Sequence, residues 1–143
     1  MPSNLTLTVM NAVHRAVIAA SFGRLGWSIA GAPVLRLTTT GRRSGRPRSV
    51  MLTSPVQLDG AFVVVASRGG DPQHPAWFWN LVTEPNVLVA WDGGAPVPMR
   101  ARVMAEDERA EHWPAVVRAY PVYGRYQRRT DRTIPLVVLE PVG

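Results

Sequence analysis

The sequence of 143 residues contains no cysteine and no lysine. Without cysteine, disulfide frameworks, thiolate zinc sites, cysteine nucleophiles and iron–sulfur clusters are excluded. No apolar run approaches the ~20 residues that a membrane-spanning helix needs. The first 14 residues also lack the basic segment and the small-residue cleavage site of a signal peptide. We therefore expect a soluble, cytoplasmic protein.

Several catalytic and binding motifs are missing as well. The three histidines, His14, His74 and His112, do not have the spacing of metal ligands, so no metal site is predicted. The chain has no Gly-x-Ser-x-Gly elbow, no P-loop and no Rossmann glycine fingerprint. If the protein is an enzyme, these absences indicate that a cofactor supplies the reactive chemistry.

Acidic residues are missing from the first 58 positions. Seven arginines lie there, more than the net charge of +6 of the whole chain. All 16 basic residues are arginine, whose planar fork suits phosphate and carboxylate groups. A GC-rich genome explains the absence of lysine more simply than selection for this chemistry. The excess of positive charge therefore lies entirely in the N-terminal part of the chain.

The length and the 46% share of hydrophobic residues fit one globular domain over residues 1–143. Apolar residues at helical spacing between Leu5 and Ala20 predict an amphipathic helix within a helical segment 1–30. This helix either covers the core of the domain or lies on an anionic membrane surface. Six segments rich in Val, Leu, Thr and Met predict strands over residues 34–39, 49–58, 61–67, 86–92, 97–105 and 133–139.

Turn residues and short helices complete the predicted fold. Asp59-Gly60 and Gly93-Gly94 predict two tight hairpins. Residues 75–83 and 107–120 predict helices between strands. Together these elements predict an α+β fold, a small β-barrel of about six mostly antiparallel strands with peripheral helices.

The segment from Thr38 to Arg48 carries four arginines within seven residues, between two predicted strands. Gly41 and Gly45 allow a tight turn, and hydroxyl and amide groups add hydrogen-bond donors. Such a loop can hold a phosphodiester. The alternative is a solvated basic hairpin.

A second segment joins two glycines to three consecutive aromatic residues. Gly69-Gly70 is predicted to expose successive amides at a strand end, and a helix N-terminus follows at Pro75. The aromatic run Trp77-Phe78-Trp79 could stack on a flat heteroaromatic ring. Alternatively, at least one of the two tryptophans fills the core, because adjacent helical residues point in different directions.

A third segment contains three tyrosines. Tyr120, Tyr123 and Tyr126 lie three residues apart and therefore share one face of a helical segment. A phenol there could donate a proton. The alternative is an interfacial tyrosine patch, with Asp131 paired to a nearby arginine.

Together these segments resemble the deazaflavin-dependent nitroreductase family of actinobacteria over roughly residues 34–141. The resemblance rests on the arginine loop, Ala66-Ser67-Arg68-Gly69-Gly70, Pro75-Ala76-Trp77-Phe78-Trp79-Asn80-Leu81, the helix from Glu108 to Trp113, and the tyrosine segment through Pro141. It implies a split β-barrel that binds coenzyme F420, a deazaflavin with a phospholactyl-oligoglutamate tail.

The resemblance also implies a set of site residues. Those expected at the tail phosphate are Arg42, Arg43, Gly45 and Arg48. Those expected along the deazaflavin ring are Met51, Leu52, Val65, Ala66, Ser67, Arg68, Ala76, Trp77, Phe78 and Asn80. Those implied on the substrate side, as candidate catalytic residues, are Tyr120, Tyr123 and Tyr126.

The chain departs from the pattern of this family at three places. Many relatives have Pro-Leu and then Tyr at the position of Met51-Leu52-Thr53. Arg43 replaces a frequent lysine, and Trp79 occupies a position that is commonly aliphatic. We expect these changes to alter the contact surface of the ring and the substrate preference.

The implied activity is transfer of hydride from reduced F420 to a planar, electron-poor acceptor: a quinone, a nitroaromatic or an enone. If the N-terminal helix touches a membrane, a lipid-soluble quinone is the natural acceptor. The alternatives are an FMN-binding split-barrel oxidoreductase and a non-catalytic F420 carrier. A nucleic-acid-binding module is disfavoured, because the aromatic residues are not interleaved with the arginines as a single-strand groove requires.

Overall fold

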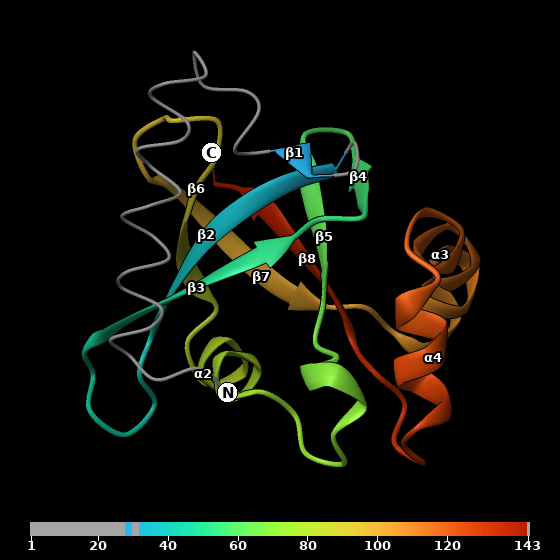
Figure 1. The fold of residues 1–143 in the computed structure, drawn as a ribbon. Helices are drawn as coiled ribbons and strands as arrows, with labels where there is room; N and C mark the ends of the chain where they lie inside the picture. The colour runs from blue at the N-terminus through green and yellow to red at the C-terminus, as the bar shows by residue number, and fades with distance from the viewer. Residues whose placement is uncertain (1–27, 30–31, 143) are drawn as a thin grey trace.

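The computed structural model describes residues 28–29 and 32–142, which form an antiparallel sheet with helices beside it (Figure 1). The strands are β1 (Ser28–Ile29), β2 (Ala32–Thr40), β3 (Pro47–Thr53), β4 (Val56–Leu58), β5 (Ala61–Val65), β6 (Asn86–Ala90), β7 (Val97–Val103) and β8 (Leu136–Pro141). The helices are the 3₁₀ turn η2 (Arg68–Gly70) and α2 (Ala76–Thr83), α3 (Glu106–Ala119) and α4 (Val122–Arg128). The predicted N-terminal helix lies outside the described residues.

Every strand pair in the described sheet is antiparallel. The strand order is β1-β2-β6-β7-β8-β5-β4, and β3 pairs with β2 off this path. The register of β2 and β3 runs from Val34 opposite Thr53 to Thr40 opposite Pro47, so the arginine loop closes this hairpin. The predicted α+β class and antiparallel pairing are confirmed. The described sheet has eight strands, where about six were expected.

The predicted strand 49–58 was wrong as one element, because the chain turns between β3 and β4. Pro55 has no amide hydrogen to donate to a neighbouring strand. The Ser54 side chain is fully buried, and its hydroxyl oxygen lies 2.9 Å and 2.8 Å from the carbonyl oxygens of Val56 and Val63. These contacts fix the turn and allow β4 to pair with β5.

The turn residues predicted the hairpin between β4 and β5 correctly, but for the hairpin between β6 and β7 they predicted its place and not the length of its loop. Asp59 and Gly60 both have positive φ, as a two-residue turn of type I′ requires, and they join β4 to β5. The hairpin between β6 and β7 forms around Asp92 and Gly93, but its loop spans residues 91–96. Pro96 lacks an amide hydrogen, which limits pairing next to this turn.

Two apolar clusters lie on opposite faces of β5. Phe62 and Val64 point into one cluster, whereas Val63 and Val65 point into the other. This arrangement explains why the strand is apolar at successive positions. Trp77, Phe78 and Leu81 of α2 contribute to the first cluster, and Val116 of α3 contributes to the second.

The helices confirm the predicted segments 75–83 and 107–120 to within one residue at each end. Figure 1 shows α2 at one end of the sheet, with α3 and α4 lying side by side next to β4 and β8. Among the described residues, no helix is both long enough and apolar enough to cross a membrane. Helix α2 thus packs on the first apolar cluster, whereas residues of α3 and α4 pack on the second.

Candidate functional site

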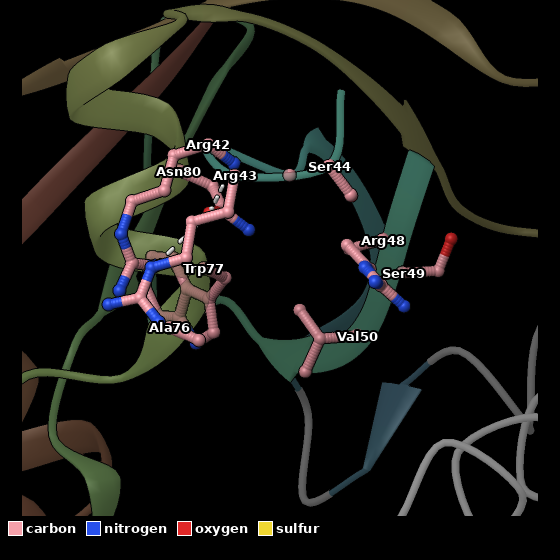
Figure 2. A pocket seen from close by; sticks show the side chains of 10 residues that line it. Arg42, Arg43, Ser44, Arg48, Ser49, Val50, Ala76, Trp77 and Asn80 are labelled. Carbon is pink, nitrogen blue, oxygen red and sulfur yellow. Dashed lines mark hydrogen bonds between the residues drawn. The ribbon is translucent and has the colours of Figure 1, made fainter. Parts of the chain in front are cut away.

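A pocket of about 400 Å³ opens between the arginine loop, β3 and α2 (Figure 2). The residues that line it are Gly41, Arg42, Arg43, Ser44, Arg48, Ser49, Val50, Ala76, Trp77 and Asn80. Three of these ten residues are arginines, and none carries a carboxylate. Arg42 and Arg43 lie on the α2 side of the pocket and Arg48 lies on the β3 side. This charge arrangement suits an anionic group that accepts hydrogen bonds from several directions.

The arginine loop is held in shape by its own backbone. The Gly41 amide donates to the Arg46 carbonyl and the Gly45 amide donates to the Gly41 carbonyl, both at 2.8 Å. Gly45 has a φ of 71°, which favours glycine. A Cβ atom on Gly41 would lie 2.7 Å from the Ser44 hydroxyl oxygen. The glycines therefore allow the compact turn that brings the arginine side chains to the pocket.

Asn80 connects α2 to the arginine loop. Its side chain is only 5% exposed, and its Oδ1 accepts hydrogen bonds from the backbone amide (3.1 Å) and from Nη1 (3.3 Å) of Arg42. Its Nδ2 donates to the Thr39 hydroxyl at 3.2 Å. A guanidinium has five N–H groups, so the single bond to Asn80 orients Arg42 and leaves further donors for a ligand.

Six of the residues expected at the cofactor line this pocket. They are Arg42, Arg43, Arg48, Ala76, Trp77 and Asn80. The arginine loop was predicted from the sequence, but Gly41 and Ser44 were not assigned to the site, and Ser49 and Val50 were not expected there. The alternation of side chains along a strand could have identified Val50, because it lies on the same face of β3 as Leu52, which was expected at the ring.

The other residues expected at the cofactor in or near β3 lie in three different surroundings. Met51 packs against Ala90, whereas Leu52 packs against the first apolar cluster, because successive residues of a strand point to opposite faces. Met51 and Leu52 therefore do not share a surface. Gly45 lines a separate cavity of about 380 Å³, together with Pro47.

The three consecutive aromatic residues of α2 do not lie on one face of the helix: two are buried and one is exposed. Trp77 is buried in the first apolar cluster and touches the pocket, and Phe78 is buried in the same cluster. The Phe78 ring lies 4.6 Å from the His74 ring, between centroids. Trp79 is 43% exposed on the outer side of the helix. The two tryptophans thus point in different directions, as helical geometry requires.

The end of β5 and the turn after it contain the remaining residues expected along the ring. Val65, the last residue of β5, belongs to the second apolar cluster. The carbonyl oxygens of Ala66 and Ser67 accept hydrogen bonds from Arg132 at 3.2 Å and 2.8 Å. Arg68 has a φ of 44° and lies 3.6 Å from the Asp71 carboxylate. The turn lies outside the lining of the arginine pocket.

The expectation that Gly69-Gly70 exposes two free amides was wrong for Gly70. Its amide donates to the Ser67 carbonyl at 2.9 Å, and Gly70 is buried. A Cβ atom on Gly70 would lie 2.7 Å from the Tyr126 carbonyl oxygen and 2.9 Å from Arg129 Cβ. Glycine is needed here because α4 packs directly against the turn.

The tyrosines form a row of edge-to-face rings, as their spacing predicted. Ring centroids lie 6.2 Å apart between Tyr120 and Tyr123, and 6.1 Å apart between Tyr123 and Tyr126. Burial is the main cause that raises the pKa of Tyr123 to about 12, so its phenol stays neutral at physiological pH and can donate a hydrogen bond. The tyrosines lie outside the lining of the arginine pocket. Asp131 forms no ion pair within residues 28–29 and 32–142.

Comparison with known proteins places these features in a family. The family described as F420H(2)-dependent quinone reductase matches residues 11–141. An F420H(2)-dependent quinone reductase of Mycobacterium tuberculosis (strain ATCC 25618 / H37Rv) is 38% identical over 136 residues, which cover 89% of this chain and 87% of that protein.

Solved structures agree with the sequence matches. An F420-H2 dependent reductase, FDR-A, is 42% identical with a TM-score of 0.66, over 76% of this chain and 94% of that chain. A structure described as a domain-swapped dimer is 36% identical with a TM-score of 0.69, over 94% of this chain and 98% of that chain. The split-barrel fold and the resemblance to F420-dependent enzymes are thereby confirmed, and this chain belongs to the F420H(2)-dependent quinone reductase family.

Proposed function

We propose that this chain uses its arginine pocket to hold the tail phosphate of coenzyme F420 and passes hydride from the reduced cofactor to a quinone. Membership of the family makes the chain an F420H2-dependent oxidoreductase, and the family description supports a quinone acceptor. The observation that carries the site assignment is the pocket itself, which three arginines line and no carboxylate does. A phosphodiester fits this donor set.

The residues of this chain have distinct roles in the proposed site. Arg42, Arg43 and Arg48 bind the phosphate, and Asn80 holds Arg42 in place. Trp77 offers an aromatic surface at the inner end of the pocket. When bound, the reduced deazaflavin supplies a hydride from C5, which together with one proton converts a quinone to a hydroquinone. The protein contributes binding, orientation and a proton donor.

The tyrosine row is the proposed substrate side. Tyr123 lies in the middle of the row, and its neutral phenol is suited to orient the acceptor by a hydrogen bond. The raised pKa makes this phenol a weaker acid, so the proton for the product comes from Tyr123 or from solvent. Nitroaromatics and enones are further planar, electron-poor acceptors that this chemistry could reduce. Contact with a membrane surface depends on residues 5–20, outside the described chain, and stays a prediction.

A titration of the protein with F420 and with FMN tests the cofactor assignment. We expect F420 to bind more tightly, and we expect Arg43→Ala to weaken its binding by about 1–3 kcal/mol through loss of a charge-assisted hydrogen bond. Arg46→Ala is the matched control, because Arg46 belongs to the same loop but does not line the pocket. Tighter binding of FMN, or equal losses in the two variants, would contradict the assignment.

Turnover of bound F420H2 tests the role of Tyr123. We expect Tyr123→Phe to lower the rate with menadione by about 10- to 100-fold, because the hydroxyl that orients or protonates the acceptor is lost. The affinity for F420 should stay nearly unchanged, since the ring and its packing are kept. Tyr120→Phe and Tyr126→Phe identify which phenol matters most. An equal loss of rate and cofactor affinity would instead make Tyr123 a cofactor-binding residue.

The choice of acceptor also distinguishes the remaining alternatives. Menadione, a nitroimidazole and an unsaturated ketone should be compared at the same concentration of F420H2. We expect the highest rate with menadione. Inactivity with all three, despite confirmed binding of F420, would favour a carrier that stores the cofactor without turnover.

A further inference from the structure

Arg132 holds the turn after β5 through four contacts. Its Nε donates to the Asp71 carbonyl at 2.8 Å, and its Nη2 donates to the Ser67 carbonyl at 2.8 Å. Its Nη1 donates to the Ala66 carbonyl at 3.2 Å and lies 2.9 Å from His74 Nδ1. One side chain thus contacts both ends of the turn.

The chemistry of these contacts calls for a guanidinium. A lysine has a single nitrogen and cannot match a planar set of donors that reaches several fixed carbonyls at once. Burial, followed by the charge of Arg132, lowers the pKa of His74, which keeps that imidazole neutral and able to accept a hydrogen bond. Arginine remains protonated in proteins, so the contacts persist across the physiological pH range.

The segment that carries Arg132 is itself held firmly. Gln127 of α4 donates from Nε2 to the Arg132 carbonyl at 2.7 Å, and its Oε1 accepts from the Ile134 amide at 2.9 Å. Arg109 of α3 donates to Gln127 Oε1 at 2.9 Å and to the Ile134 carbonyl at 2.7 Å. The Arg109 guanidinium also lies 4.3 Å from the centroid of the Trp113 ring. The Arg132 guanidinium therefore extends from a rigid support toward the turn.

We propose that Arg132 is a positioning residue that sets the backbone of residues 66–71, so that the reacting ring of the cofactor is aligned for hydride transfer. The inference rests on the proposed function and on the expectation, implied by the family resemblance, that Ala66, Ser67 and Arg68 meet the edge of the deazaflavin ring. The arginine pocket does not include the turn, so tail binding and ring alignment are separable. Loss of Arg132 should therefore affect the rate of transfer more than the affinity for the cofactor.

Amide hydrogen exchange without cofactor tests the first step of the proposal. Arg132→Ala should speed exchange of the Gly70 and Asp71 amides, which donate within the turn, by about tenfold or more. Arg125→Ala is the matched control, because Arg125 is an exposed arginine of α4 whose side chain makes no hydrogen bond among the described residues. It should leave the exchange of residues 66–71 unchanged. Unchanged exchange at residues 66–71 in Arg132→Ala would overturn the proposal.

Single-turnover kinetics test the consequence for the reaction. At saturating F420H2 and with menadione as acceptor, Arg132→Ala should lower the transfer rate by about 10- to 100-fold, because small misplacements of reacting groups are costly. The dissociation constant for F420 should change by less than about threefold, since the tail contacts remain. Arg125→Ala should keep the wild-type rate. Methylguanidinium added to Arg132→Ala should restore part of the rate.

Equal transfer rates for Arg132→Ala and Arg125→Ala would reduce Arg132 to a purely structural role. If Arg132→Ala does not fold, Arg132→Gln keeps part of the donor set and is measured in the same two ways. Failure of the wild-type protein to oxidise F420H2 would contradict the proposed function, whereas a normal rate in Arg132→Ala beside an active wild type contradicts only this inference.

Discussion

Asn80→Asp is expected to weaken F420 binding by about 2–4 kcal/mol, because it places a negative charge beside the arginines of the pocket. Asn80 Oδ1 already accepts two hydrogen bonds from Arg42, so an aspartate there would pair with that guanidinium and reduce its attraction for a phosphate. The change keeps the size of the side chain and its acceptor oxygen. A fluorescence titration with F420 at low salt measures the effect.

Asn80→Ala distinguishes the effect of the added negative charge on F420 binding from the effect of losing the hydrogen bonds of Asn80. This variant removes the support of Arg42 and of the Thr39 hydroxyl but adds no charge, so its affinity for F420 should lie between that of the wild type and that of Asn80→Asp. Raising the salt concentration should reduce the difference in F420 affinity between Asn80→Asp and Asn80→Ala, because salt screens the repulsion between the carboxylate and the phosphate. If Asn80→Asp binds F420 as tightly as the wild type does, the phosphate lies elsewhere.

Gly70→Ala is expected to lower the free energy of unfolding by about 2–4 kcal/mol. Two costs add at this position. The backbone has a φ of 85°, which an L-side chain adopts only under strain, and the new Cβ would lie 2.7 Å from the Tyr126 carbonyl oxygen. Denaturant unfolding monitored by tryptophan fluorescence gives the value.

Gly69→Ala is the matched control for this prediction. Gly69 also has a positive φ, of 66°, but a Cβ there would meet nothing within 4 Å. Only the conformational cost applies, so the loss should be about 1–2 kcal/mol. Equal losses in the two variants would show that the packing of α4 against the turn contributes nothing measurable.

Local patterns in the sequence predicted the elements whose causes are themselves local. The turn at Asp59-Gly60 follows from residues that tolerate positive φ. The position of α2 follows from Pro75 at its start, and that of α3 from its acidic first turn. The arginine loop was recognisable for the same reason, since its glycines and arginines lie within eight residues, 41–48. The break at Ser54-Pro55 was missed, although Pro55 was a visible signal against a continuous strand.

The sequence by itself determined the antiparallel α+β class, the basic loop between two strands and the tyrosine row, because each depends on residues that are close along the chain. Only the tertiary structure decided which of those residues meet. Asn80 reaches Arg42 across 38 positions, and Arg132 reaches Ser67 across 65. Such contacts form when strand pairing and core packing bring distant segments together, and no local periodicity encodes them. For that reason the role of Gly70 as a contact for α4, and that of Arg132 as the support of the turn, became visible only in the folded chain.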